Sequence, residues 1–185
     1  MANKILVGAN GTPIVWADTT DYAGDGGTRT HQIDLTSLGD AAARQGAKAD
    51  MDTGGVSNRL PRRWAVTLRV EFDVAPSDNT TVDLYWAASL SSTAATANPG
   101  GTTGSDAAYT GTAGSTLAES LNQLQFIGSL YNTNDAATVV LQQTFITVIP
   151  LQYGMPVVIN NGGQAFEGDA IEMSITFTPL EDEVQ

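Results

Sequence analysis

Hydrophobic and polar residues alternate along the stretch from Trp64 to Leu90, which has the clearest periodicity in the chain. Because successive side chains of a β-strand point to opposite faces, a period of two predicts two strands with one buried and one solvated face. A polar corner at 75–79 separates the strands and is longer than the two-residue turn of a tight hairpin. The strands therefore either pair with each other or lie in different sheets. The residues predicted to face the core are Trp64, Val66, Leu68, Val70, Phe72, Val74, Val82, Leu84, Trp86, Ala88 and Leu90.

Further strands are predicted at 125–131, 138–149, 155–159 and 170–178. The run at 138–149 keeps no single apolar face, which indicates a bulge or burial on both faces. Pro156 favours an edge strand or the start of a strand. The sequence Thr116-Leu-Ala-Glu119 fits a capping box and predicts one short helix. Together these segments predict an all-β, antiparallel sandwich, and the long connection at 91–115 favours a Greek-key or jelly-roll winding.

The N-terminal third contains no long alternating pattern. Its short apolar pieces, at 5–7 and 14–16, are separated by Gly and Pro, so they cannot build a core of their own. One helix candidate of about two turns begins after Ser37 and is limited by Gly39 and Gly46. The domains predicted are an extended arm over residues 1–62, a β-sandwich over residues 63–180 and an acidic tail over residues 181–185.

Charge divides the chain into two halves. All eight Lys and Arg residues lie before residue 70, so residues 1–69 carry a formal charge of +1 and residues 70–185 carry −13, within a total of −12. Such an acidic body repels the phosphates of nucleic acids. The chain has no Cys, which excludes disulfides and thiolate metal sites. No apolar run suits a membrane span or a signal peptide, so we expect no membrane partner and synthesis in the cytoplasm.

Catalytic chemistry has little support in the sequence. His31 is the only histidine, and although Asp34 is placed to orient it, no Gly-x-Ser-x-Gly elbow accompanies them. The tripeptide at 52–54, Asp-Thr-Gly, matches aspartic proteases but lacks their apolar flanking strands. Carboxylates beside glycines at 21–25 and 167–169 are explained by turn chemistry as well as by Ca²⁺ binding. We therefore expect no enzymatic activity, no cofactor and no metal.

Six segments of the chain, taken together, resemble those of a known class of protein. They are ILVGANGTPIVWADTTDY, RTHQIDLTSL, ARQGAKAD, TVDLYWAASLSSTAATANPGGTTGSDAAYTG, LQFIGSL and VVINNGGQAF. In composition and order they resemble the capsid decoration, or cement, proteins of tailed bacteriophages. The resemblance covers most of the chain, and it transfers no individual functional residue. It implies a jelly-roll sandwich on the outer capsid surface of the virion, which in some members of the class is clustered as trimers.

The charge distribution and this resemblance together give the N-terminal arm a docking role. We expect the arm to contact the major capsid protein or a neighbouring copy of the chain in a homotrimer, while residues 70–180 face solvent. Deletion of residues 1–58 should then abolish particle binding and leave a folded body. The predicted partner-binding residues are Trp16, Arg44, Lys48, Arg59, Arg62 and Arg63.

Two other classes of function remain open on the sequence alone. A carbohydrate- or receptor-binding module of a phage tail or fibre needs an exposed aromatic pair, such as Tyr109 with Tyr131 or Tyr153. Trp64 and Trp86 do not suit such a platform, because their register points them into the core. A hydrolase on a sandwich scaffold needs a convergent pair of carboxylates, which the sequence does not display.

Overall fold

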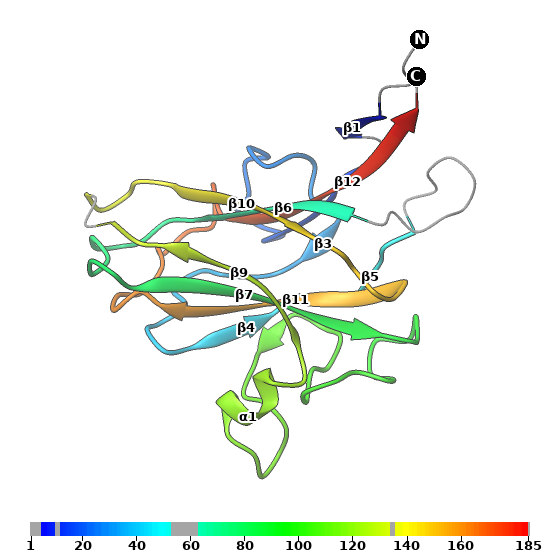
Figure 1. Cartoon of the computed structure of the whole chain (residues 1–185). Helices are drawn as coiled ribbons and strands as arrows, with labels where there is room; N and C mark the ends of the chain where they lie inside the picture. The colour runs from blue at the N-terminus through cyan, green and yellow to red at the C-terminus, as the bar shows by residue number, and fades with distance from the viewer. Residues whose placement is uncertain (1–4, 10–11, 53–62, 134–135, 185) are drawn as a thin grey trace.

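The computed structural model describes residues 5–9, 12–52, 63–133 and 136–184. Two β-sheets pack face to face as a sandwich (Figure 1), which confirms the all-β fold. Within these residues the one α-helix is α1 (Leu117–Leu121), and no helix among them is long and apolar enough to cross a membrane.

Each sheet has six strands. The first contains, in spatial order, β10 (Leu141–Thr147), β6 (Arg63–Val70), β12 (Ser174–Val184), β2 (Ile14–Ala17) and β3 (His31–Gln32), and β1 (Ile5–Ala9) pairs with the end of β12. The second contains β8 (Ala107–Ala108), β4 (Ala43–Gln45), β11 (Tyr153–Asn161), β7 (Thr81–Ser89) and β9 (Gln125–Tyr131), and β5 (Ala49–Asp50) also pairs with β11. Among the pairs formed by these strands, only β2 and β3 run parallel.

Eight of the strands follow a jelly-roll winding. In chain order they are β2, β4, β6, β7, β9, β10, β11 and β12. The first pairs with the eighth, the second with the seventh, the third with the sixth and the fourth with the fifth, all antiparallel. β6 and β7 consequently lie in different sheets, and the corner at 75–79 crosses between them. The jelly-roll-type sandwich predicted from the sequence is therefore confirmed.

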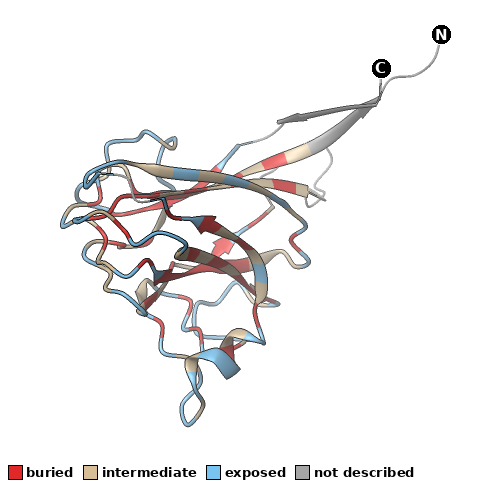
Figure 2. Cartoon of the chain, turned by 60° about the vertical axis from the view of Figure 1, so that its left-hand side comes forward, coloured by how far each residue is buried: buried red, intermediate tan, exposed pale blue. Residues whose placement is uncertain are grey.

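The alternating residues of β6 and β7 form the centre of the core. In β6, Trp64, Val66, Leu68 and Val70 are buried and alternate with partly buried residues. Buried residues occur along the strands of both sheets (Figure 2). The prediction was wrong at the two strand ends. Val74 is half exposed, because β6 ends at Val70, and Leu90 is exposed because it follows the last residue of β7.

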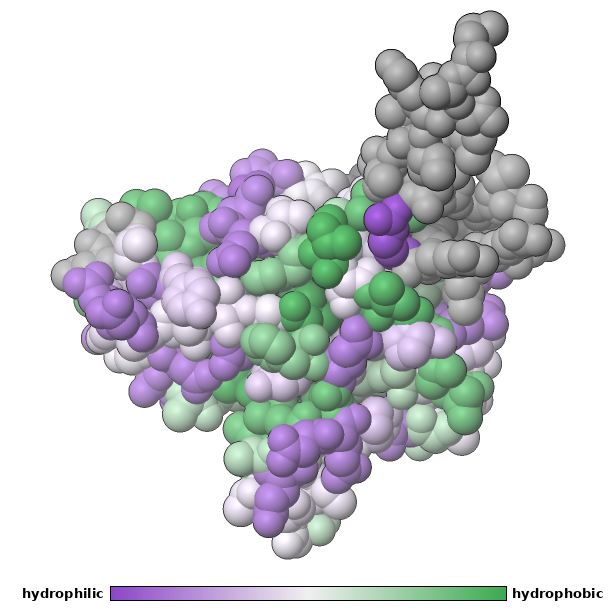
Figure 3. Space-filling view, in the orientation of Figure 1, coloured by the Kyte–Doolittle hydropathy of each residue, from purple (hydrophilic) through white to green (hydrophobic). Residues whose placement is uncertain are grey.

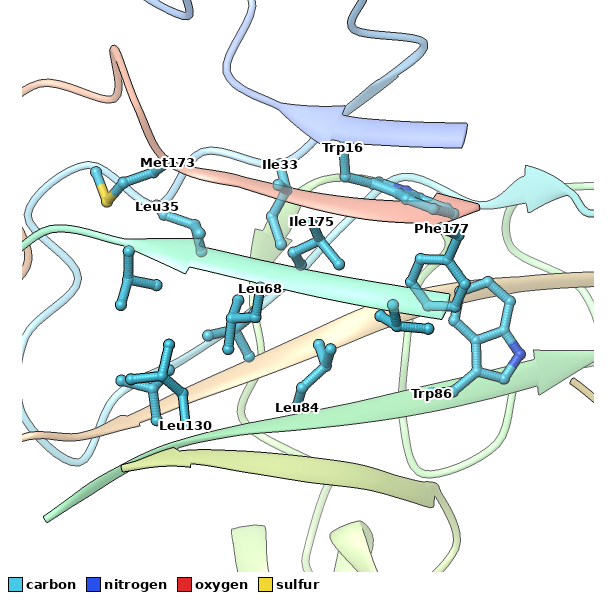
Figure 4. Close-up of a cluster of buried hydrophobic side chains, with 14 of the residues drawn as sticks. Trp16, Ile33, Leu35, Leu68, Leu84, Trp86, Leu130, Met173, Ile175 and Phe177 are labelled. Carbon is cyan, nitrogen blue, oxygen red and sulfur yellow. The ribbon is translucent and has the colours of Figure 1, made fainter. Parts of the chain in front are cut away.

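Aromatic rings from both sheets meet at one end of the core (Figure 4). The Trp16 ring centroid lies 5.2 Å from that of Phe177 in the same sheet and 5.8 Å from that of Trp86 in the opposite sheet. Phe177 also packs against Trp86, with 5.0 Å between centroids. All three side chains are fully buried. The indole N–H of Trp16 donates a hydrogen bond from Nε1 to the carbonyl oxygen of Ala47 at 2.7 Å.

Residues 12–52 differ from the extended arm that was expected, because they are built into both sheets. β2 and β3 belong to the first sheet, and β4 and β5 to the second. These strands are short and bounded by turns, so they gain their stability from pairing with β12 and β11 rather than from an amphipathic pattern of their own.

The helix expected after Ser37 is not formed. Ser37 and Ala41 have φ angles of 51° and 57°, which an α-helix does not contain, and β4 follows directly. Asn160 of β11 holds this segment in place. Its Nδ2 donates to the carbonyl oxygen of Leu38 at 2.8 Å, and its own carbonyl accepts from the Ala41 amide at 2.7 Å.

A third layer covers the outer face of the second sheet. The capping box of α1 is formed as predicted, with Thr116 accepting from the Glu119 amide. A second apolar cluster lies beneath this layer and comprises Ala43, Ala87, Tyr109, Leu124, Met155, Val157 and Ile159. β11 is therefore buried on both faces, which explains its continuous apolar run.

Pro156 lies inside β11, in the middle of the second sheet, rather than at an edge. Its carbonyl accepts from the Gly46 amide at 2.9 Å, so its nitrogen also faces the side where β4 has ended and β5 has not yet begun. The missing N–H therefore removes no bond between β11 and β7. A break in the neighbouring strand makes proline acceptable in this central strand.

Residues 181–184, predicted as a tail, continue β12 and pair with β1. We refer to β1 and residues 180–184 of β12 as the terminal ribbon. It projects beyond the sandwich at one corner (Figure 1).

Replacing Trp16 by Ala should destabilise the protein strongly. The substitution removes a fully buried ring that joins the two sheets, and losses of this kind cost roughly 3 to 5 kcal/mol. Leu90→Ala is the control, since that side chain is 77% exposed. Denaturant unfolding measures both free energies, and equal effects of the two substitutions would contradict the packing described.

Candidate interaction surfaces

Arg44 is committed to an ion pair inside the chain. Its Nε donates to Oδ1 of Asp106 at 2.6 Å and its second guanidinium nitrogen to Oδ2 at 2.8 Å, a bidentate geometry. Asp34 lies 3.9 Å away and adds negative charge. The hydrogen bond to Asp106, followed by these nearby charges, raises the pKa of Arg44. The side chain fastens the long loop to β4 rather than presenting a free cation to a partner.

Lys48 holds the beginning of the same loop. Its ammonium lies within hydrogen-bonding distance of four oxygens, and it has three protons to share among them. These acceptors are Ser89 Oγ at 2.9 Å and the carbonyl oxygens of Ser91 at 3.1 Å, Thr93 at 2.8 Å and Thr96 at 2.9 Å. Burial lowers the pKa of Lys48. Its positive charge is used to order residues 91–96.

The other predicted partner-binding residues have three different placements. Trp16 lies in the core, where its side chain cannot contact a partner. Arg63 begins β6 and is partly buried. Arg59 and Arg62 lie outside the described residues. The four that are described do not form one exposed surface, because Trp16 is buried and Arg44 and Lys48 are paired within the chain.

The candidate catalytic and sugar-binding residues are also dispersed. The His31 ring packs on Trp16, with 5.3 Å between centroids, and its Nδ1 lies 2.9 Å from the Thr30 hydroxyl. Burial, followed by the charge of Arg29, lowers the pKa of His31. Tyr109 is buried and donates to the Gly100 carbonyl at 2.6 Å, so it cannot form the exposed aromatic pair that a glycan platform needs.

Carboxylates gather around Glu71, which follows β6 and is buried. Its pKa is raised to about 7, first by burial, next by a hydrogen bond shared with Glu172, and then by the negative charges of Glu172, Glu167 and Asp169. Among the residues that the structure describes, no group of His, Asp or Glu side chains is arranged to hold a metal ion. Glu167 and Asp169, in the segment considered for Ca²⁺, are among the charges that raise the pKa of Glu71.

Exposed apolar side chains that the sequence pattern did not predict lie on β9 and β10 and next to them. β9 and β10 are edge strands of the two sheets, and they lie next to each other. The ring of Phe145 covers Gly128, where an added Cβ would approach it to 2.4 Å, and Gln125 Nε2 donates to the Val148 carbonyl at 2.9 Å. Figure 3 views this side of the molecule and shows hydrophobic residues on it.

The large apolar side chains of this group are exposed to 41–69%, and they are Phe126, Tyr131, Val139, Ile146 and Val148. The sequence does contain a signal for them. Between Ser120 and Phe166 the only charged residue is Asp135, in a chain with 28 charged residues.

Replacing Lys48 by Met should loosen the long loop. Met keeps the length of the side chain but leaves the carbonyl oxygens at 91–96 without their donor, which costs roughly 1 to 3 kcal/mol. Limited proteolysis and hydrogen exchange should show faster cleavage and exchange there. Arg29→Met is the matched control, because it removes the same charge from an exposed residue. Unchanged protection of residues 91–96 would contradict the role assigned to Lys48.

Replacing Glu71 by Gln should stabilise the protein at high pH only. The pKa of Glu71 is about 7 in the folded state against 4.5 as its ordinary value, so the folded protein binds the extra proton between these values. The contribution of this group to stability is complete below pH 4.5 and is lost as the pH rises through 7. Gln stays neutral, so the variant should gain roughly 1 to 3 kcal/mol at alkaline pH and almost nothing in acid.

Denaturant unfolding on both sides of this pH window measures the effect of Glu71→Gln. Asp78→Asn, at an exposed acid of the next loop, is the control. A gain in stability that is the same at both pH values would show that the burial of charge is not its cause.

No family model, no curated protein and no solved structure matches the chain. The resemblance to decoration proteins therefore rests on the sequence segments alone, and the function has to be argued from the surfaces described above.

Proposed function

We propose that this chain is a structural protein that binds the outer surface of a bacteriophage capsid and stabilises it, without catalytic activity. The sequence segments described above support the proposal, and so does the fold, since a jelly roll of this kind is the architecture that the resemblance implies. The observation that carries the proposal furthest is the terminal ribbon, which extends beyond the sandwich and is available to reach a second protein.

We therefore propose docking through the terminal ribbon instead of through the long N-terminal arm expected from the sequence. Residues 12–52 are needed within the sandwich, and both Arg44 and Lys48 have partners there. The ribbon carries three consecutive acids, Glu181, Asp182 and Glu183. A surface of the major capsid protein with exposed Lys or Arg residues would complement them, and such an interaction weakens as salt is added.

A deletion of residues 1–58 cannot distinguish a loss of docking from a loss of folding. It would remove β2 and β4, which are the first two strands of the jelly roll, together with Trp16. The remaining chain should therefore fail to fold, and a loss of particle binding by this variant would carry no information about docking.

Deleting residues 1–9 is the more informative variant. Among the described strands β1 pairs with the end of β12 alone, so the sandwich should keep its thermal unfolding transition while binding to capsids that lack the protein is lost. Co-sedimentation with such capsids measures the binding. A second variant, Glu181→Gln with Asp182→Asn and Glu183→Gln, keeps the ribbon and should bind more weakly. Full occupancy of capsids by the truncated protein would contradict docking through the ribbon.

A further inference from the structure

The outer face of β7 and β9 presents aromatic and polar side chains together. The two strands lie side by side at one edge of the second sheet (Figure 1). The residues of β7 that face the core are Val82, Leu84 and Trp86. The residues that alternate with them point outward, and they are Thr81, Asp83 and Tyr85. Their partners in β9 lie on the same face, and they are Tyr131, Ser129 and Phe126.

Aromatic rings stand at both ends of this face. Phe126 packs edge-on against Tyr85, with 5.2 Å between the ring centroids, and its side chain is 52% exposed. Tyr131 is 69% exposed and pairs with Thr81, four residues from Tyr85 along β7. Four residues of a strand span about 13 Å. The rings are therefore separated by a strip of polar side chains rather than stacked in one cluster.

Asp83 lies midway along this strip and is held in a fixed orientation. Ser129 Oγ donates to its Oδ1 at 2.6 Å, and Asn161 Nδ2 donates to its Oδ2 at 3.0 Å. A carboxylate offers about four acceptor positions, so these two bonds leave others for a ligand. Burial, followed by the charge of Asp83, raises the pKa of Tyr85, which keeps the phenol protonated and able to donate.

This combination of groups restricts the class of ligand. An apolar protein surface would bury the remaining acceptor positions of Asp83 without partners, which is unfavourable. Phosphates would meet a carboxylate in a chain with a net charge of −12. Among the residues that the structure describes, no group of side chains is arranged to hold a metal ion. A sugar ring suits the face, because its C–H surface stacks on aromatic rings while its hydroxyls donate to carboxylates and amides.

We propose that the outer face of β7 and β9 binds a neutral oligosaccharide, with Phe126 and Tyr131 stacking on sugar rings and Asp83 accepting hydrogen bonds from hydroxyl groups. The separation of the two aromatic positions favours a chain of sugars over a single ring. Phe126 thus takes the place of the buried Tyr109 in the aromatic pair expected from the sequence. The site belongs to the second sheet and the terminal ribbon extends from the first, so the failure of either proposal leaves the other intact.

Phe126→Ala and Asp83→Asn test the two kinds of contact separately. The first removes a stacking ring that is half exposed, and the second keeps the size of the side chain but removes its charge and part of its acceptor capacity. Ile146→Ala is the control, because it removes an apolar side chain that is 64% exposed from the first sheet. Thermal unfolding checks that each variant of the full-length protein keeps its fold.

An array of neutral glucose, galactose, mannose and N-acetylglucosamine oligomers provides the ligands, and calorimetry measures the dissociation constant of the sugar that binds most tightly. Phe126→Ala and Asp83→Asn should each raise this constant roughly tenfold or more, and Ile146→Ala should leave it unchanged. Added salt should have little effect, since a neutral ligand has no charge to screen.

Two results would overturn the proposal. One is wild-type protein that binds no member of the array, or variants at Phe126 and Asp83 that bind as tightly as the wild type. The other is binding to a lysine-rich peptide that weakens as salt is added, without binding to the array, which would assign this face to a basic protein partner.

Discussion

The packing of Trp16 against Phe177 and Trp86 is the interaction on which the rest of the structure depends. It joins the first strand of the jelly roll to the eighth and both to the opposite sheet. The site is closely fitted, because a Cβ added at Gly46 would lie 2.8 Å from Cδ1 of Trp16. Since Trp16 and Phe177 are 161 residues apart in sequence, the core closes only when the last strand is in place, and such non-local pairing makes folding slow.

Two cations of the basic N-terminal half bind groups of the acidic half within the fold. Arg44 and Lys48, from the basic half, hold the long loop of the acidic half through Asp106 and a group of carbonyl oxygens. These contacts place the loop and α1 over the second sheet and bury β11 on both faces. The terminal ribbon, which contains three consecutive acids in its sequence, projects beyond the sandwich at one corner.

Local sequence signals predicted the parts of the fold that depend on local interactions. The alternation in β6 and β7 and the capping box at Thr116 are properties of neighbouring residues, and both are confirmed. β2 and β4 carry no comparable signal, because their stability comes from pairing with strands more than a hundred residues away. The prediction that Pro156 lies at an edge or at the start of a strand was wrong for a similar reason. The gap between β4 and β5, which allows proline in this central strand, depends on residues far away in the sequence.

The candidate site was less predictable than the fold. Positive charge alone does not distinguish a docking residue from one that binds a loop, and the partners of Lys48 are backbone carbonyls that no sequence pattern marks. The exposed side chains of β9 and β10 could have been found from the absence of charge between Ser120 and Phe166, although sequence periodicity could not show that β9 and β10 are edges.

The central claim is that this jelly roll is a structural component of a phage capsid. Quantitative analysis of purified virions tests it most directly, by comparing the number of copies of this chain with that of the major capsid protein. The account predicts copy numbers of the same order, with the protein accessible to added protease at the particle surface. Absence from the virion, or presence in only the few copies typical of a tail or fibre component, would contradict it.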